Sequence, residues 1–268
     1  MVLAVDIGNS NIDCGVFAAE DILAHWTFPT AIDRDAQHQR PGFPREPGLF
    51  AQYWQEGFAN GLAQASIAIE DVRHVIVGTV VREVAALSKV LDRLFKKPIV
   101  WADCRMDFGL DIEYDDPASL GIDRLLGALA AAELYSLPVI VVDMGTAITV
   151  DMVTADRHFV AGAIAPGRQM AAEALYQRTS LLPRVDLSVP PTLTGRSTSE
   201  CIRSGVFYGT VGLVDGLIER MRNEMVPGAY VVATGGDAAS IGQVSRHIQT
   251  VNPHLVLWGL YLLHKRSM

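Results

Sequence analysis

The sequence has few cysteines and no long uninterrupted hydrophobic run. Its three cysteines, Cys14, Cys104 and Cys201, are odd in number and widely spaced, so they predict neither a zinc site nor a disulfide framework. The longest apolar runs, such as 134–142, are too short or too interrupted to cross a bilayer. Residues 1–5 carry no basic stretch or cleavage site, so we expect no signal peptide. These absences predict reduced thiols in a cytoplasmic protein without a membrane partner.

An excess of basic residues is also missing. The chain of 268 residues has 22 Lys and Arg against 30 Asp and Glu, which leaves a formal net charge of -8. This balance argues against nucleic acid as a partner held by bulk electrostatics, although a local site could still bind an anion. Half of the residues are hydrophobic, so disorder is excluded as a global description, and the length suits one large domain or two modest ones.

Three common nucleotide-binding signatures are absent. No Gly-x-x-x-x-Gly-Lys-Ser/Thr run occurs, which excludes a P-loop kinase. The catalytic set of protein kinases is missing as well. No Gly-x-Gly-x-x-Gly follows the first apolar segment, which counts against a dinucleotide-dependent oxidoreductase. Any nucleotide site in this chain must therefore be built in another way.

The hydrophobic pattern predicts strands and helices in two successive series. Apolar and β-branched runs predict strands, helical spacing predicts helices, and the proline-rich segment 29–47 predicts a loop. The first series comprises strands at 2–5, 12–17, 22–28, 74–81 and 98–102 and helices at 49–65, 83–95 and 119–135. The second comprises strands at 138–142, 148–153, 158–164 and 230–234, helical segments within 169–178 and 199–225, and a closing helix at 255–264.

A strand that ends in Asp-x-Gly-polar opens each series. The first copy is Asp6-Ile7-Gly8-Asn9 and the second is Asp143-Met144-Gly145-Thr146. A repeat of this kind predicts an α/β protein with two similar halves, residues 1–136 and 137–268, and an active site in the cleft between them.

Both turns carry the chemistry of a phosphate site. Gly8 lets the backbone approach a phosphate, and Asn9, Ser10 and Asn11 can add side-chain donors. Asp6 could hold Mg²⁺, which prefers one or two carboxylates plus phosphate oxygens. The residues 143–147 offer the same chemistry, so two such turns could clamp a polyphosphate. Taken singly, each pattern fits an ordinary polar turn equally well.

Two further segments bear polar or glycine-rich patterns. In Gly121-Ile122-Asp123-Arg124, Asp123 could accept a proton from a substrate hydroxyl while Arg124 binds an anionic group. An acidic residue near a helix start is also commonly only a cap or a dipole partner. In Thr234-Gly235-Gly236-Asp237, the two glycines could let an adenine or a ribose lie against the backbone, or could simply form a tight turn.

Taken together and in order, these motifs resemble the type III pantothenate kinases, which belong to the acetate-kinase, sugar-kinase, Hsp70 and actin superfamily. The resemblance runs through nearly the whole chain. The matching segments are 6–11 (Asp-x-Gly-Asn-Thr-Asn in the family), Pro117 with 121–124 (Pro-x-x-x-Gly-x-Asp-Arg), 143–147, 162–167, Leu182-Pro183, 195–198 and 234–237. Ser10 replaces the common Thr but keeps its hydroxyl, and the substitutions at Gly78, Gly127 and Ala161 also depart from the usual pattern.

The resemblance implies two ribonuclease H-like halves, a duplicated actin-like ATPase core, and transfer of phosphate from ATP to pantothenate, the first step of coenzyme A synthesis. It implies Asp123 as the general base, Mg²⁺ with ATP, a monovalent cation (K⁺ or NH₄⁺) at Asp143, and a homodimer. The implied pantothenate contacts are Tyr114, Gly121, Ile122, Asp123, Arg124 and Thr198. The implied ATP contacts are Asp6, Ile7, Gly8, Asn9, Ser10, Asn11, Ile12, Asp13 and Thr146.

Two alternatives stand beside this hypothesis. The substitutions at Gly127 and around Gly78 are compatible with a non-catalytic protein that keeps the nucleotide fold and acts through a partner. A kinase of the same superfamily that acts on another hydroxyl compound would carry the same phosphate turns. Binding of both ligands discriminates the first alternative, and a panel of substrates discriminates the second.

Overall fold

The described part of the chain, residues 1–30, 47–81 and 84–268 of a computed structural model, divides into two units. Unit 1 comprises Met1–Phe108, Ala118–Leu129 and Val256–Met268, and unit 2 comprises Gly109–Pro117 and Ala130–Leu255. The division at residue 136 stays a prediction, and the final helix groups with unit 1. Most of the loop predicted at 29–47 lies outside the described residues.

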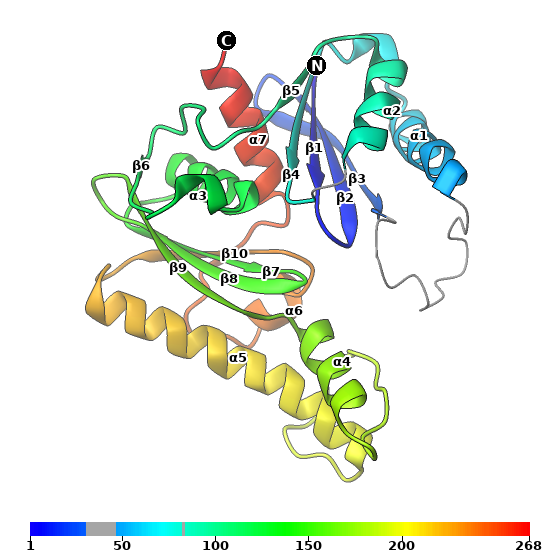
Figure 1. Ribbon diagram of the computed structural model, residues 1–268. Helices are drawn as coiled ribbons and strands as arrows, with labels where there is room; N and C mark the ends of the chain where they lie inside the picture. Colours follow the sequence, from blue (N-terminus) through cyan, green and yellow to red (C-terminus); the bar gives the residue numbers. More distant parts are fainter. Residues whose placement is uncertain (31–46, 82–83) are drawn as a thin grey trace. The chain divides into compact units, whose positions relative to one another are not determined.

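Unit 1 is built on a five-stranded sheet (Figure 1). Its strand order is β3-β2-β1-β4-β5, in which β1 pairs antiparallel with β2 and parallel with β4. The central strand β1 is apolar almost throughout because both of its faces are covered. The strands are β1 (Val2–Ile7), β2 (Asn11–Ala18), β3 (Asp21–Pro29), β4 (His74–Thr79) and β5 (Ile99–Trp101). The helices are α1 (Pro47–Gln64), η1 (Ile69–Asp71), α2 (Ala85–Phe95) and α7 (Leu255–Arg266), together with the start of α3 (Ile122–Leu134).

The core of unit 1 follows from the helical spacing of its apolar residues. In α2, a stripe that includes Leu87, Leu91 and Phe95 is buried and joins the side chains of β1 and α1 in one cluster. Helix α7 packs on Phe17 of β2, whose ring stacks on Tyr261 with centroids 4.6 Å apart. Burial of these rings removes large apolar surfaces from water and stabilises the sheet on which the first predicted turn lies.

Unit 2 repeats this arrangement with one strand added. Its strand order is β11-β10-β7-β8-β9-β6, with β7 antiparallel to β8 and parallel to β10. The strands are β6 (Asp111–Ile112), β7 (Val139–Met144), β8 (Ala147–Val153), β9 (His158–Pro166), β10 (Tyr230–Thr234) and β11 (Thr250–Val251). The helices include α4 (Arg168–Arg178), α5 (Thr198–Glu224) and α6 (Ala238–Gly242). The 3₁₀ helix η2 (Pro117–Ser119) lies at the point where the chain passes from unit 2 back to unit 1.

Helix α5 is a continuous helix of 27 residues, where the sequence predicted helical segments within 199–225. Phe207, Val214 and Ile218 are fully buried in one cluster with β7, β8 and β10. Within the described part of the chain, α5 is the one helix long and apolar enough to span a membrane, but 44% of its apolar window is buried. A core helix of a soluble protein passes the same test, and the packing of α5 explains its apolar face.

The two sheets share one topology, which confirms the predicted duplication. The order β3-β2-β1-β4-β5 in unit 1 corresponds to β9-β8-β7-β10-β11 in unit 2. Asp6 and Asp143 are each the penultimate residue of the corresponding strands, β1 and β7. The sequence did not predict β6, β11, α6 or the two 3₁₀ helices, because each has only two to five residues and no usable hydrophobic period.

Candidate active site

The first predicted phosphate turn is the tip of the β1–β2 hairpin in unit 1. The backbone N–H of Gly8 donates to the carbonyl of Asn11 at 2.9 Å and closes the turn. Asn9, Ser10 and Asn11 are exposed, so their polar side chains can reach a ligand. Asp6 is half-buried and lies opposite Asp13 in the strand register. The eight residues 6–13 predicted to contact ATP therefore form one hairpin end, in which the side chains of Ile7 and Ile12 are buried in the core and the polar side chains lie nearer the surface.

Thr30 holds this turn in place, and the sequence did not single it out. Its Oγ1 donates to the carbonyl of Gly8 at 2.7 Å, and its backbone N–H donates to the carbonyl of Ser10 at 3.0 Å. Its own carbonyl accepts a hydrogen bond from Nε1 of the buried Trp54 at 2.9 Å. Thr30 is fully buried, so these bonds are shielded from water. A threonine at a strand end is common, which is why no sequence signal marked it.

Asp123 and Arg124 begin helix α3. One carboxylate oxygen of Asp123 accepts a hydrogen bond from the backbone N–H of Arg124 at 2.9 Å. A Cβ on Gly121 would lie 2.5 Å from that same oxygen, so the glycine leaves room for the carboxylate. Asp123 stays half-exposed while Arg124 is buried. The carboxylate thus binds a backbone N–H in the first turn of the helix and belongs to a half-exposed residue, which is compatible with both roles considered for it.

The second predicted phosphate turn joins β7 to β8 in unit 2. The N–H of Gly145 donates to the carbonyl of Ala147 at 3.0 Å and closes the turn. From outside the turn, the N–H of Gly167 donates to the carbonyl of Thr146 at 3.1 Å, and that of Asp237 donates to the carbonyl of Met144 at 3.2 Å. Three segments of unit 2 therefore meet at Asp143 and Thr146, and one of them is the Thr-Gly-Gly-Asp segment.

Glycine is required at two of these contacts. A Cβ on Gly167 would lie 2.3 Å from the carbonyl oxygen of Gly145. Gly235 has φ +90°, and its Cβ would lie 2.5 Å from Oδ1 of Asp143 and 2.6 Å from the carbonyl oxygen of Met144. Backbone approach this close is possible only without a side chain. The segment 162–167 and the Thr-Gly-Gly turn thus shape the surroundings of Asp143.

The chemical type of these oxygens is the type that a hard cation takes. Oδ1 of Asp143 and the carbonyl oxygen of Met144 both pack against the backbone of Gly235, and oxygen atoms are the ligands of such cations. Among the residues that the structure describes, no group of three or more His, Cys, Asp or Glu could hold a metal. A cation at Asp143 would therefore complete its coordination with other oxygens, such as those of a phosphate.

A buried arginine lies behind the same turn. Arg168, the first residue of α4, is 3% exposed, and its Nη1 donates to Oδ1 of Asp237 at 2.7 Å. Its Nη2 donates to the carbonyl of Leu187 at 2.5 Å, and its guanidinium lies 5.0 Å from the centre of the Phe207 ring. No sequence motif marked Arg168, although a basic residue in the first turn of a helix, where acidic residues are favoured, was an available signal.

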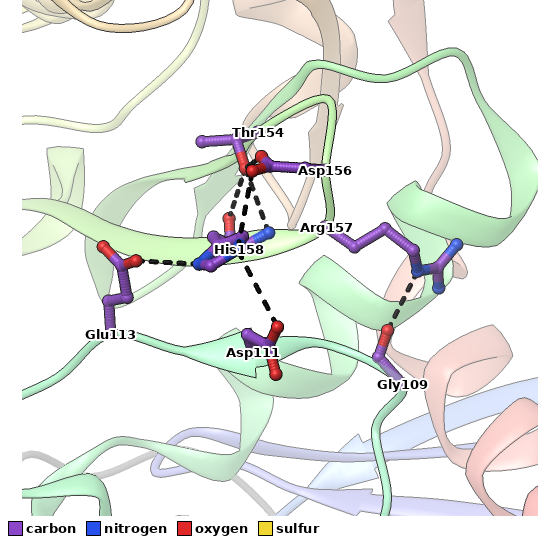
Figure 2. Close-up of polar contacts among 7 residues, drawn as sticks. All are labelled: Gly109, Asp111, Glu113, Thr154, Asp156, Arg157 and His158. Atoms are coloured by element: carbon purple, nitrogen blue, oxygen red, sulfur yellow. Dashed lines mark hydrogen bonds and ion pairs between the residues drawn. The ribbon is translucent and has the colours of Figure 1, made fainter.

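Tyr114, one of the predicted pantothenate contacts, follows strand β6. Figure 2 shows how that segment is attached to β9: Nδ1 of His158 lies 2.7 Å from Oε1 of Glu113, and Nε of Arg157 donates to the carbonyl of Gly109 at 2.9 Å. Asp111 and Asp156 also face the imidazole, at 3.7 and 3.5 Å. The hydrogen bond with Glu113, together with these carboxylates, raises the pKa of His158.

Thr198, the other pantothenate contact predicted in unit 2, is the first residue of α5. The side chain of Ser197 caps this helix by accepting a hydrogen bond from the N–H of Glu200 at 3.3 Å. The preceding residues Thr194, Gly195 and Arg196 line a cavity of about 190 Å³. Thr198 and Tyr114 lie on separate elements of unit 2, whereas Gly121–Arg124 belong to unit 1.

The comparisons with known proteins agree with this arrangement. The family model described as type III pantothenate kinase matches residues 2–220, more than half of the chain. A Baf family transcriptional activator from Campylobacter jejuni is 18% identical with a TM-score of 0.59, and 99% of this chain and 98% of that chain are covered.

Two further solved structures have the same fold. A ROK family glucokinase from Streptomyces griseus in complex with glucose and AMPPNP is 12% identical (TM-score 0.53, covering 98% and 99% of the two chains). MreB 5 of Spiroplasma citri bound to AMPPNP is 13% identical (TM-score 0.52, covering 99% and 96%). At such identities the likeness shows the fold alone, a duplicated actin-like ATPase core. With the family match over residues 2–220, the chain belongs to the type III pantothenate kinase family and is an ATP-using kinase.

Proposed function

We propose that the chain transfers the γ-phosphoryl group of ATP to the primary hydroxyl of pantothenate, with Asp123 as the general base. The observation that carries this proposal is the family match combined with a half-exposed carboxylate at the start of α3. Asp123 accepts the hydroxyl proton, and the hydroxyl oxygen bonds to the γ-phosphorus. The bond from that phosphorus to the β-phosphate oxygen breaks, and ADP leaves.

Other residues of the motif position pantothenate in this proposal. Arg124 pairs with the substrate carboxylate through its planar fork, and Gly121 and Ile122 contribute backbone contacts. Tyr114 and Thr198 are the other pantothenate contacts in this proposal. Phosphoryl transfer depends chiefly on positioning and charge stabilisation, so one base and a set of oriented donors suffice.

The two Asp-x-Gly turns bind ATP in this proposal. Residues 6–13 and Thr146 supply backbone and side-chain donors to the phosphates. Mg²⁺ bound with ATP and a monovalent cation at Asp143 would neutralise negative charge on the phosphates. The carboxylate of Asp143 and the neighbouring carbonyl oxygen of Met144 are oxygen ligands of the kind that supports a cation at Asp143, and the exposed donors at Asn9, Ser10 and Asn11 support phosphate binding.

The test is an assay for 4′-phosphopantothenate with ATP, Mg²⁺, and K⁺ or NH₄⁺. We expect Asp123→Asn to lower kcat by about 100-fold or more, because general base catalysis contributes that much or more. Asp92→Asn, at an exposed position on α2, is the matched control and should keep wild-type activity. Failure of the wild-type protein to form the product with either cation would refute the proposal.

The proposal also includes a cytoplasmic homodimer, as the family resemblance implies. Light scattering at micromolar concentration should then give about twice the chain mass of 29.1 kDa. A particle with the mass of one chain would remove the dimer from the proposal and leave the reaction unaffected.

A further inference from the structure

Arg168 is placed where a positive charge is costly. It is 3% exposed and begins helix α4, where the helix dipole disfavours a cation. Its Nε is buried and has no hydrogen-bond partner among the residues that the structure describes. The ion pair with Asp237 and the Phe207 ring offset part of this cost. An apolar residue would fill this position with less difficulty, so the guanidinium calls for an explanation beyond packing.

One arm of the guanidinium reaches the second phosphate turn. Asp237, which accepts from Nη1, donates its backbone N–H to the carbonyl of Met144, the residue after Asp143. Gly167, the residue before Arg168, donates to the carbonyl of Thr146. Arg168 is therefore connected to this turn in two ways, through its own contact with Asp237 and through its chain neighbour Gly167.

The other arm reaches the segment 179–197, which leads to Thr198. Nη2 donates to the carbonyl of Leu187, whose side chain packs in a small cluster with Ile202 and Val206 of α5. The adjacent Asp186 pairs with Arg203 of α5 at 2.7 Å. Leu187 is thus fixed to the first turns of the helix that Thr198 begins, and all of these residues belong to unit 2.

We propose that Arg168 couples nucleotide binding at the second phosphate turn to pantothenate binding at the Thr198 segment. This inference rests on the proposed function, because it takes both ligand sites from it. Arg168 is a positioning residue: it contacts neither ligand and fixes the two segments in one arrangement. Coupling between sites is reciprocal, so each ligand then strengthens the binding of the other.

The test measures the dissociation constant of pantothenate by calorimetry, without and with saturating AMPPNP. We expect AMPPNP to tighten pantothenate binding to the wild-type protein by about 5-fold or more. Arg168→Met should bind each ligand alone and bring that ratio close to one. Arg168→Lys keeps the charge but cannot reach Asp237 and Leu187 together with a planar fork, so its ratio should also fall. Arg105→Met, which removes an exposed ion pair with Asp103 in unit 1, should keep the wild-type ratio.

The ratio separates coupling from stability, because a merely structural role would weaken both measurements alike. If Arg168→Met does not fold, as judged by circular dichroism, Arg168→Lys decides. The inference would be overturned if AMPPNP did not change the pantothenate affinity of the wild-type protein, or if folded Arg168→Lys showed the same ratio as the wild type. In either case, an active wild-type kinase leaves the proposed function intact. A wild-type protein that neither binds nor phosphorylates pantothenate overturns both.

Discussion

The two Asp-x-Gly turns share a sequence pattern and a place in the sheet, but they are supported in different ways. In unit 1, the turn after β1 is held by one buried side chain, Thr30, which is itself anchored by Trp54. In unit 2, the turn after β7 is held by backbone groups that come close because Gly167 and Gly235 have no side chain. The two turns therefore need not tolerate the same substitutions, although they share one sequence motif.

The difference predicts which changes each turn can absorb. A hydroxyl contact can be lost without moving the backbone, so damage in unit 1 should be graded. A Cβ forced between backbone atoms must move a whole segment, so damage in unit 2 should be severe. The experiments below test this contrast in order of decreasing effect.

The largest effect is expected from Gly235→Ala. The new Cβ would lie 2.5 Å from Oδ1 of Asp143, and the residue would have to keep φ +90°. We expect a loss of about 3 kcal/mol or more in the free energy of unfolding, with loss of nucleotide binding. Gly236→Ala is the control, since nothing lies within 4 Å of its Cβ. Urea denaturation measures the free energy of unfolding of both variants. Equal values for Gly235→Ala and Gly236→Ala would show that the second turn does not require a glycine at position 235.

A smaller effect is expected from Thr30→Val. The substitution keeps the shape of the side chain but leaves the carbonyl of Gly8 without the Oγ1 donor, which costs about 1–2 kcal/mol. Because the turn is then held less firmly in its binding position, the KM for ATP should rise more than the KM for pantothenate. Thr30→Ser keeps the hydroxyl and should restore most of the ATP affinity. Identical KM values for Thr30→Val and the wild type would show that the hydroxyl does not position the turn.

Trp54→Phe should have a smaller effect again. It removes the Nε1 donor to the carbonyl of Thr30 at 2.9 Å but leaves both bonds from Thr30 to the turn. We expect a loss of about 1 kcal/mol in stability and a nearly unchanged KM for ATP. A thermal melt and steady-state kinetics on the same preparation check both expectations. A rise in KM as large as that of Thr30→Val would mean that the indole positions the turn directly.

The smallest effect concerns an ion pair that lies outside both turns. His158 holds the Tyr114 segment, and its pKa is raised above the ordinary value of 6.5 by Glu113 and the nearby carboxylates. A raised pKa means that the stabilisation is fully present below pH 6.5, while the carboxylates are ionised, and is lost as pH rises through the folded-state pKa.

His158→Gln tests this pH dependence. The melting temperature of the wild type should exceed that of the variant at mildly acidic pH, and the difference should vanish at alkaline pH. The effect is small because the imidazole and its partners are partly exposed and screened by solvent. A difference that stays constant with pH would assign the contact a packing role only.

Much of this architecture was predictable, because long segments with a regular hydrophobic pattern can be recognised in the sequence. The apolar runs of β1, β7 and β10 and the helical stripe of α2 were predicted with ends within a few residues of those observed. Both Asp-x-Gly turns and the start of α3 were predicted from polar residues that directly follow or precede such segments. Local chemistry and local structure coincide at these places, so the sequence is informative there.

The supports of the site were not predictable in the same way. Thr30, Arg168 and Gly167 contact residues 19 or more positions away, and only the fold brings the partners together. A threonine at a strand end and an arginine on a helix are ordinary choices in isolation. Strand β6 is likewise defined by its pairing with β9 and not by a pattern of its own.

Helix α7 has a consequence for the order in which the protein can assemble during synthesis. Tyr261 and Trp258 cover Phe17, and the hydroxyl of Tyr261 reaches the carbonyl of Ala19 across 242 positions of sequence. The ribosome makes the whole of unit 2 before it makes α7. Unit 1, although it contains the first residue of the chain, therefore cannot finish its core until unit 2 has been synthesised.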